Sequence, residues 1–284
     1  MKVSVLINNH NYAGFLTEAV EAALRQTSPP AEIIVVDDGS TDGSLAIARQ
    51  LAATHPAIIK VIAQENRGQL SAMIAGIRAA SSDWCAFLDA DDTWQPDHLA
   101  SAERALARHP DIDVHYTCHR ETTGPPRFRS KWSPGILGPC GALVFASGCR
   151  IGTITSTFVL RTEIAKAIAQ SLVGLEDDWR TRADDCLLFG AAIVGAKFHY
   201  DASPTVNYRI HGNNHFAGLG RRKMNRNTMR GNEFCSTDSR KALASGPANL
   251  PIGYSPNPTS RETADMRGSA GGSSATSKNN PPSR

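Results

Sequence analysis

The stretch Trp84-Cys85-Ala86-Phe87-Leu88-Asp89-Ala90-Asp91-Asp92 decides the fold prediction for this chain of 284 residues. Its apolar first half is typical of a strand buried on both faces of a sheet. Three carboxylates follow within four residues, and they repel one another unless a cation lies among them. Because ligands of open α/β sheets bind at the carboxyl ends of strands, the Asp-x-Asp-Asp sequence predicts a magnesium or manganese site at Asp89, Asp91 and Asp92.

The chain around this stretch alternates between apolar runs of strand length and segments with helical periodicity. We expect strands at residues 3–7, 33–36, 58–62 and 84–88, helices between them, and a further helix from Pro96 to about Arg108. This alternation predicts an α/β fold with a mostly parallel sheet and helices on both of its faces.

The second half of the chain is less regular, and we expect an irregular region there. Residues 122–141 read as a long loop, residues 162–172 and 183–194 as helices, and residues 197–200 and 205–209 as short strands. From about Ser236 onward Ser, Gly, Pro and Asn dominate, which predicts a disordered low-complexity tail over residues 236–284.

Composition excludes several classes of protein. A net charge of +3 is too small to indicate nucleic-acid binding. No apolar run approaches the roughly 18 residues that cross a bilayer, and the first residues enter a strand pattern without a signal peptide. The six cysteines lack paired spacing, so we expect reduced thiols in a cytoplasmic protein. His115, Cys118 and His119 lie close in sequence, but strand packing explains them better than zinc does.

Polar clusters follow each of the first four predicted strands, and together they predict one crevice. We expect His10 to stack on a flat base that Asn8 and Asp38 hydrogen-bond, with Arg67 near a phosphate or holding a base-contacting acid. Neither a dinucleotide-binding glycine motif nor a P-loop is present.

These motifs together resemble those of a known family. Asn8-x-x-Asn11, the run Ile-Ile-Val-Val-Asp-Asp-Gly-Ser-Thr-Asp at 33–42, Glu65-Asn66-Arg67-Gly68 and Phe87-Leu88-Asp89-Ala90-Asp91-Asp92 are similar to the inverting family 2 glycosyltransferases of the GT-A fold. The resemblance is strong over residues 1–110 and weak as far as about residue 216. It implies a nucleotide-sugar-binding half at 1–110 and an acceptor-side half of the same domain at 111–235.

The resemblance also implies roles for individual residues. Asp38 would contact the base of a nucleotide sugar, with UDP as the expected nucleotide. Asp89, Asp91 and Asp92 would hold Mg²⁺ or Mn²⁺ on the diphosphate. Asp185, in the pair with Asp184, would be the general base of a hexosyl- or hexosaminyltransferase. The chain departs from the family pattern at His10, which lies within the Asn8-x-x-Asn11 motif. It departs again at Cys186-Leu187-Leu188, which follow the acid pair.

Inverting transfer needs a carboxylate on the face of the sugar opposite the leaving group, and Asp184-Asp185 at a predicted helix start suits that need. The competing interpretation is that both acids only complement the helix dipole. His211 is a candidate for the diphosphate or the metal, or a structural histidine. A basic stretch would suit a solvated helix face, a phosphate-bearing acceptor or the inner face of a membrane: Arg221, Arg222, Lys223, Arg226 and Arg230.

Two other functions stay open at this point. A sugar-1-phosphate nucleotidyltransferase would need a glycine-rich, basic N-terminal loop, which the chain lacks. A non-catalytic nucleotide-sugar-binding protein would lose the base, which the chain keeps. The expected partners are a nucleotide-sugar donor and a carbohydrate, lipid-linked or small-molecule acceptor. The sequence does not indicate an oligomeric state.

Overall fold

The computed structural model describes residues 1–122, 133–142, 144, 151–152, 154–176, 180–212 and 214. The expected alternation of strands and helices is confirmed in the first half. Its elements are β1 (Val3–Asn9), α1 (Ala13–Leu24), β2 (Glu32–Asp38), α2 (Ser44–Thr54), β3 (Ile59–Gln64), α3 (Gln69–Ala79), β4 (Trp84–Asp89), the short β5 (Thr93–Trp94) and α4 (His98–Arg108). The tail that the sequence predicts to be disordered lies outside the described residues.

The second half of the described chain is more regular than its sequence pattern predicts. It contains β6 (Val114–Glu121), β7 (Gly135–Pro139), the 3-10 turn η1 (Thr155–Thr157), β8 (Phe158–Arg161), α6 (Thr162–Ser171), α7 (Ala183–Ile193) and β9 (Lys197–Tyr208). The helices α6 and α7 agree with the two predicted helical segments, whereas β6, β7 and β8 were not predicted as strands. No helix in this part or elsewhere in the described chain is long and apolar enough to cross a membrane.

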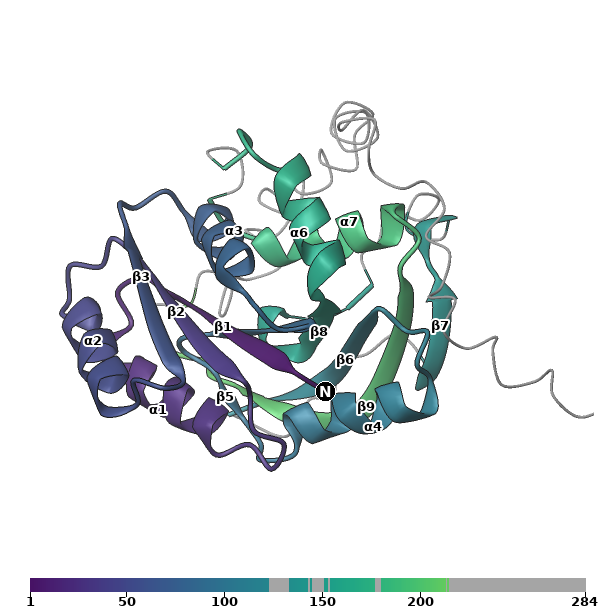
Figure 1. The fold of residues 1–284 in the computed structure, drawn as a ribbon, viewed down its shortest axis with the longest axis horizontal. Coiled ribbons are helices and arrows are strands. Elements are labelled where there is room, and N and C mark those ends of the chain that lie inside the picture. The colour runs from purple at the N-terminus through teal and green to yellow at the C-terminus, as the bar shows by residue number, and fades with distance from the viewer. Residues whose placement is uncertain are drawn as a thin grey trace, which may run out of the picture. The chain divides into compact units, whose positions relative to one another are not determined.

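All of these strands belong to one sheet, in the order β3-β2-β1-β4-β8-β6-β9-β5, with β7 paired to β9 (Figure 1). The expected parallel arrangement holds for β3, β2, β1 and β4. Beyond β4 the sheet is mixed, because β8 pairs antiparallel with both β4 and β6. The parallel half therefore brings the carboxyl ends of its strands to a single edge, as the clustered polar residues predict.

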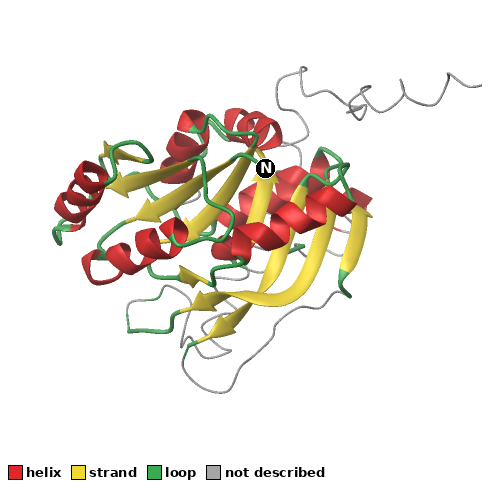
Figure 2. Cartoon of the chain, turned by 60° about the horizontal axis from the view of Figure 1, so that its bottom comes forward, coloured by secondary structure: helices red, strands yellow, loops and turns green. Residues whose placement is uncertain are grey.

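The helices cover both faces of this sheet, and the alternation of side chains along the strands explains why (Figure 2). Val5 and Ile7 of β1 pack in one buried cluster with α1, α2 and α4. Leu6 between them packs in a second cluster with α3, α6 and α7. A strand that is apolar at consecutive positions feeds both clusters, since successive side chains point to opposite faces.

The two short strands predicted at residues 197–200 and 205–209 are wrong, because β9 runs without a break from Lys197 to Tyr208. Its pairing with β6 shifts register on both sides of Cys118, the residue that lies opposite Pro204. A bulge accommodates a proline that cannot donate to the ladder. The predicted loop at 122–141 also contains β7, which pairs with β9. Residues 123–132 of that loop lie outside the described residues.

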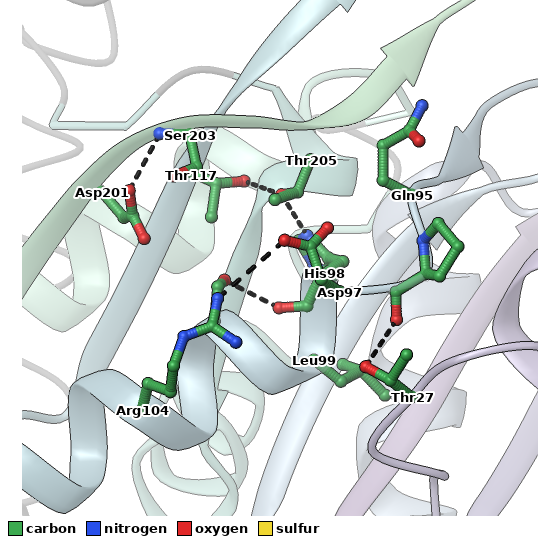
Figure 3. A network of polar contacts seen from close by, with 12 residues as sticks. Thr27, Gln95, Asp97, His98, Leu99, Arg104, Thr117, Asp201, Ser203 and Thr205 are labelled. Carbon is green, nitrogen blue, oxygen red and sulfur yellow. Dashed lines mark hydrogen bonds and ion pairs between the residues drawn. The ribbon is translucent and has the colours of Figure 1, made fainter.

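A polar network ties α4 to β9 and β6 (Figure 3). The Nδ1 atom of His98 lies 2.8 Å from the Thr205 hydroxyl, which donates over 2.8 Å to the hydroxyl of Thr117. The backbone N–H of Gln95 donates to the backbone carbonyl of Thr205 over 2.7 Å. These contacts hold β9 in place, and the chain that leaves β9 then reaches the acids after β4.

Candidate active site

Three residues predicted for the crevice meet on one face of the sheet. Asn8 lies opposite Asp89 in the β1–β4 pair, and Asp38 ends the neighbouring β2. By strand alternation these residues share the face of Leu6, Val36 and Phe87, which α3 covers. They line a cavity of about 460 Å³ together with Asn9, His10, Tyr12, Asn66, Gly68, Gln69, Ala72, Asp91, Arg180, Thr181, Tyr208 and Asn214.

The two asparagines at the end of β1 have different surroundings. The Asn9 amide donates to Asp37 over 2.8 Å and to Ser40 over 3.0 Å, so it organises the turn after β2. Asn8 is 9% exposed, and its Oδ1 atom is buried without a hydrogen-bond partner among the described residues. A buried acceptor without a partner is costly, and among the described residues Asn9 Oδ1 is likewise buried without one.

Asp38 is held in place by three donors from the start of α3 and from β3. Its Oδ1 accepts from Gln64 Nε2 over 2.7 Å and from the Arg67 amide over 2.9 Å, while its Oδ2 accepts from the Gly68 amide over 2.8 Å. A carboxylate normally has about four acceptor positions, two on each oxygen. The remaining capacity therefore belongs to Oδ2.

His10 and Arg67 occupy different positions relative to the cavity. His10 lies at the cavity wall, with Nδ1 2.8 Å from the Asp38 carbonyl oxygen and the ring beside the Asn66 amide. Arg67 is exposed and is absent from the cavity lining, although its backbone holds Asp38. The arginine at the cavity is Arg180, whose guanidinium donates to Asn66 Oδ1.

The three acids after β4 do not act as one set. Asp89 and Asp91 line the cavity, whereas Asp92 does not. Asp92 accepts from the Ser156 hydroxyl over 2.6 Å and from the Arg209 amide over 3.0 Å. Burial and the neighbouring Asp91 raise the pKa of Asp92 to about 8, and burial with Asp91, Asp92 and Asp184 raises the pKa of Asp89 well above its ordinary value.

His211 returns to the acids from the segment after β9. Its Nε2 lies 3.1 Å from Asp91 Oδ2, and the Asn214 amide donates to the same oxygen over 3.2 Å. The His211 ring stacks on Phe15 with 4.7 Å between centroids. Burial, followed by the charges of Asp91 and Asp89, raises the pKa of Tyr12 beside them. His211 therefore stands beside a predicted metal ligand, as the sequence allowed.

The acid pair at the start of α7 is buried. Asp184 is 8% exposed and Asp185 is 1% exposed. Arg182 pairs with Asp185 through its guanidinium, whereas the charge of Asp184 acts on Asp89. Neither acid lines the cavity, but Arg180 and Thr181 just before them do.

The donor set of this cavity fits a divalent cation bound to a diphosphate. Among the described residues no three His, Cys, Asp or Glu side chains form a ready metal-binding group. Magnesium usually takes one or two protein carboxylates and completes its shell with water and substrate phosphates. Asp89 and Asp91 supply that number of hard oxygen ligands, and their mutual repulsion falls when a cation lies between them.

Sequence reasoning missed several cavity residues. Tyr12 directly follows the polar cluster after β1, and Tyr208 stands in the segment that resembles the family, so position in sequence was a usable signal for both. Gln69 directly follows the Glu65-Asn66-Arg67-Gly68 motif, and Asn214 lies three residues after His211, so position was a usable signal for these two as well. Arg180 follows no motif, and only the packing of α3 against the loop before α7 brings it to Gln69.

Comparisons with known proteins identify the family and the fold. Residues 4–166 match the family model of Glycosyl transferase family 2. An uncharacterized glycosyltransferase, alr2836 from Nostoc sp., is 34% identical over 229 residues, which are 76% of this chain and 67% of that protein.

Two solved structures share the fold. S. aureus TarS 1-349 in complex with UDP-GlcNAc is 20% identical with a TM-score of 0.59, and the match covers 78% of this chain and 62% of that one. The mannosyltransferase PcManGT from Pyrobaculum calidifontis, in complex with GDP-Man and Mn²⁺, is 19% identical with a TM-score of 0.53, covering 86% and 72%. This chain thus spans less than two thirds of the TarS fragment. It has the GT-A fold and belongs to glycosyl transferase family 2, a family of transferase enzymes.

Proposed function

We propose that this protein transfers a sugar from a UDP-sugar to a hydroxyl acceptor with inversion at the anomeric carbon. One observation carries the proposal: Asn8, Asp38, Asp89 and Asp91 converge on one cavity at the carboxyl ends of parallel strands. Family membership supports sugar transfer, and the nucleotide sugars bound to TarS and PcManGT support the donor class. The match to a glycosyltransferase family favours this function over a nucleotidyltransferase.

The end of the cavity beside Asp38 suits a uracil base. The open acceptor position on Asp38 Oδ2 matches the N3–H donor of uracil. His10 lies at the cavity wall, which supports a role in stacking on the base.

The end of the cavity beside Asp89 and Asp91 suits the diphosphate. When bound, Mg²⁺ or Mn²⁺ would neutralise the charge that develops on the departing nucleoside diphosphate. Asp89 and Asp91 would hold the cation, with His211 beside Asp91 orienting that carboxylate. Asp92 is assigned a supporting role, because Ser156 and the Arg209 backbone already occupy its oxygens.

Asp185 is our candidate for the general base. Arg182 pairs with it through its guanidinium, and a carboxylate is the kind of group that accepts a proton from the acceptor hydroxyl. Asp184 is the second candidate. Its charge acts on Asp89, one of the acids proposed to hold the cation. This makes it the weaker candidate, because the base of an inverting transfer must lie on the face of the sugar opposite the leaving group.

The acceptor class remains open among carbohydrates, lipid-linked molecules and small molecules. A lipid-linked acceptor would suit peripheral contact with a membrane through the basic stretch at residues 221–230, which lies outside the described residues. Residues 176–178, with the sequence Glu-Asp-Asp, are a further acidic cluster that could supply a base, and Glu176 is its described member. Its carboxylate accepts from the Gly174 amide in an exposed turn, which supports a structural role.

A donor screen tests the proposed function. The full chain is incubated with UDP-, GDP- and dTDP-sugars, Mn²⁺ and simple sugar acceptors, and release of the nucleoside diphosphate is measured. We expect turnover with a UDP-sugar, loss of turnover in excess EDTA, and a product of inverted anomeric configuration by NMR. Turnover with every donor equal to that of an Asp91→Asn control would contradict the proposal, and tight UDP binding without turnover would favour a binding protein.

A further inference from the structure

The start of α3 and the start of α7 are locked together, although 114 residues separate the two ends of one of the contacts. The backbone N–H of Gln69 donates to the backbone carbonyl of Arg180 over 2.9 Å. Gly68 has a φ of +89°, and a β-carbon there would lie 2.6 Å from the Arg180 α-carbon. Only glycine allows so close an approach in that backbone conformation. The loop before the acid pair therefore rests directly on the loop that holds Asp38.

The side chain of Gln69 completes this junction by capping α7. Ala183 is the first residue of that helix, and its amide donates to Gln69 Oε1 over 3.1 Å. The first amides of a helix have no partner within the helix, so they need one from elsewhere. Arg182 at the N-cap position has a left-handed backbone with φ +65° and provides no side-chain cap. Gln69, from α3, therefore caps the start of α7.

The nitrogen of the Gln69 side-chain amide faces the side of the cavity proposed for the diphosphate. Gln69 Nε2 lies 3.5 Å from Asp89 Oδ1, at the long limit of a hydrogen bond. One planar amide thus connects the acid proposed to hold the cation with the first amide of the helix that carries Asp184 and Asp185. Gln69 also lines the cavity, so a ligand that fills it meets this side chain.

We propose that Gln69 is a positioning residue that couples an occupied donor site to the placement of the general base on α7. The inference rests on the proposed function for its catalytic consequence, but the contact between α3 and α7 is open to test without turnover. A ligand that draws Asp89 toward the diphosphate tightens the short chain Asp89–Gln69–Ala183. With a donor bound, the start of α7 is then held more firmly than in the free protein.

Gln69→Met tests the coupling, because it keeps the length and the backbone contact to Arg180 but removes both polar ends of the side chain. Amide hydrogen exchange is followed over residues 181–190, with and without UDP and Mn²⁺. In the natural protein we expect UDP and Mn²⁺ to slow exchange there. In Gln69→Met we expect faster exchange in the free protein, by about 10-fold, and no further slowing on UDP binding.

Two further variants show which contact matters. Gln69→Glu keeps an acceptor for the Ala183 amide but cannot donate to Asp89, so the free protein should exchange as the natural one does while the response to UDP is lost. Gln64→Met is the matched control at the base end, since Gln64 Nε2 donates to Asp38 Oδ1 and to Ser71. It should weaken UDP binding and leave exchange at α7 of the free protein unchanged.

Kinetics with the donor found in the screen separate positioning from binding. Gln69→Met should lower kcat by about 10-fold while KM for the donor changes less than about 3-fold, the pattern of an interaction lost in the transition state. Gln64→Met should raise KM instead. Unchanged exchange at α7 in Gln69→Met, with or without UDP, would overturn the inference. If no donor is turned over but the exchange results hold, the proposed function fails and the coupling stands.

Discussion

The acids after β4 and the histidines between α4 and β9 are both buried titratable clusters, but they serve different ends. Burial raises the pKa of Asp89 and Asp92, whereas burial lowers the pKa of His98 and His115 to about 3. Both shifts have one physical cause, since a low-dielectric interior disfavours whichever form is charged. The direction of a shift therefore says nothing about function.

The surroundings of the two clusters distinguish them. Asp89 and Asp91 open onto a cavity with Asn8 and Asp38, whereas the histidines contact one another and the core. The Nδ1 atoms of His115 and His199 lie 3.0 Å apart in stacked rings, and His98 stacks on Trp94 with 4.3 Å between centroids. A perturbed pKa indicates a site only when a cavity and convergent polar groups accompany it. Five predictions test this contrast.

The largest expected effect is on the acid cluster. Asp91→Asn removes one hard ligand and its charge, so we expect turnover to fall by about 10³-fold and UDP–Mn²⁺ affinity to fall with it. The melting temperature should hold or rise, because repulsion with Asp89 is relieved. Asp111→Asn is the control, since Asp111 is exposed and pairs with Lys197. Full activity of Asp91→Asn at limiting Mn²⁺ would place the cation elsewhere.

The base should respond differently from the metal acids. Asp185→Asn keeps the shape of the side chain and removes its basicity, so turnover should fall by about 10²-fold or more while UDP affinity measured by calorimetry stays nearly intact. Asp184→Asn should lose less turnover. If Asp184→Asn is instead the inactive variant, the base is one residue earlier than proposed. If both variants stay active, neither acid is the base.

A histidine variant should show the opposite pattern. His98→Asn removes a fully buried ring that stacks on Trp94, while the asparagine amide can still reach Thr205. We expect a loss of about 2 kcal/mol in unfolding free energy, equivalent to roughly 4–8 °C in melting temperature, with turnover of the folded protein unchanged. A loss of turnover without a loss of stability would show that the histidine cluster takes part in function.

The pH dependence of stability sharpens the same comparison. The pKa of His98 and of His115 is about 3 in the folded protein against an ordinary value of 6.5, so between these limits the unfolded chain binds more protons. The contribution of these two histidines to the unfolding free energy therefore falls as pH falls from about 6.5 toward 3, by at most about 1.4 kcal/mol per pH unit for each histidine. The raised pKa of Asp89 and of Asp92 gives a contribution of opposite sign, so the comparison is made between variants that keep both acids.

Denaturant titrations at pH 7 and pH 5 measure this slope. His98→Asn should flatten it, whereas His55→Asn should not, because His55 is exposed at the end of α2. The neighbours that face the histidines, Asp201 and Arg104 among them, stay in place in both variants. Equal slopes in His98→Asn and the natural protein would show that His98 does not titrate with unfolding.

The smallest expected effect concerns the chain beyond both clusters. Composition predicts that residues from about 236 onward contribute no packed core. A protein that ends at Cys235 should therefore keep its melting temperature within about 1 °C, and both clusters should keep their properties. A larger fall on a thermal scan would show that the tail packs on the rest of the protein.

The sequence by itself determined the parallel half of the sheet and the edge where its polar residues gather. Local pattern was sufficient there because most of these strands are apolar and buried, each ends in a polar turn, and parallel pairing brings those ends to one edge of the sheet. Polar residues at the ends of neighbouring strands also predicted that Asn8, Asp38 and Asp89 share one crevice. Their common face follows from the strand bounds in the structure.

Only the tertiary structure decided the rest. Asp92 accepts hydrogen bonds from Ser156 and Arg209, although nothing in the sequence distinguishes it from the adjacent Asp91. The bulged β9 joins two segments that a proline separates in the pattern. Gln69, Arg180 and the start of α7 meet through contacts between residues 111 or more apart in the chain. Such contacts leave no periodicity, because they depend on how whole elements pack rather than on the spacing of residues within one element.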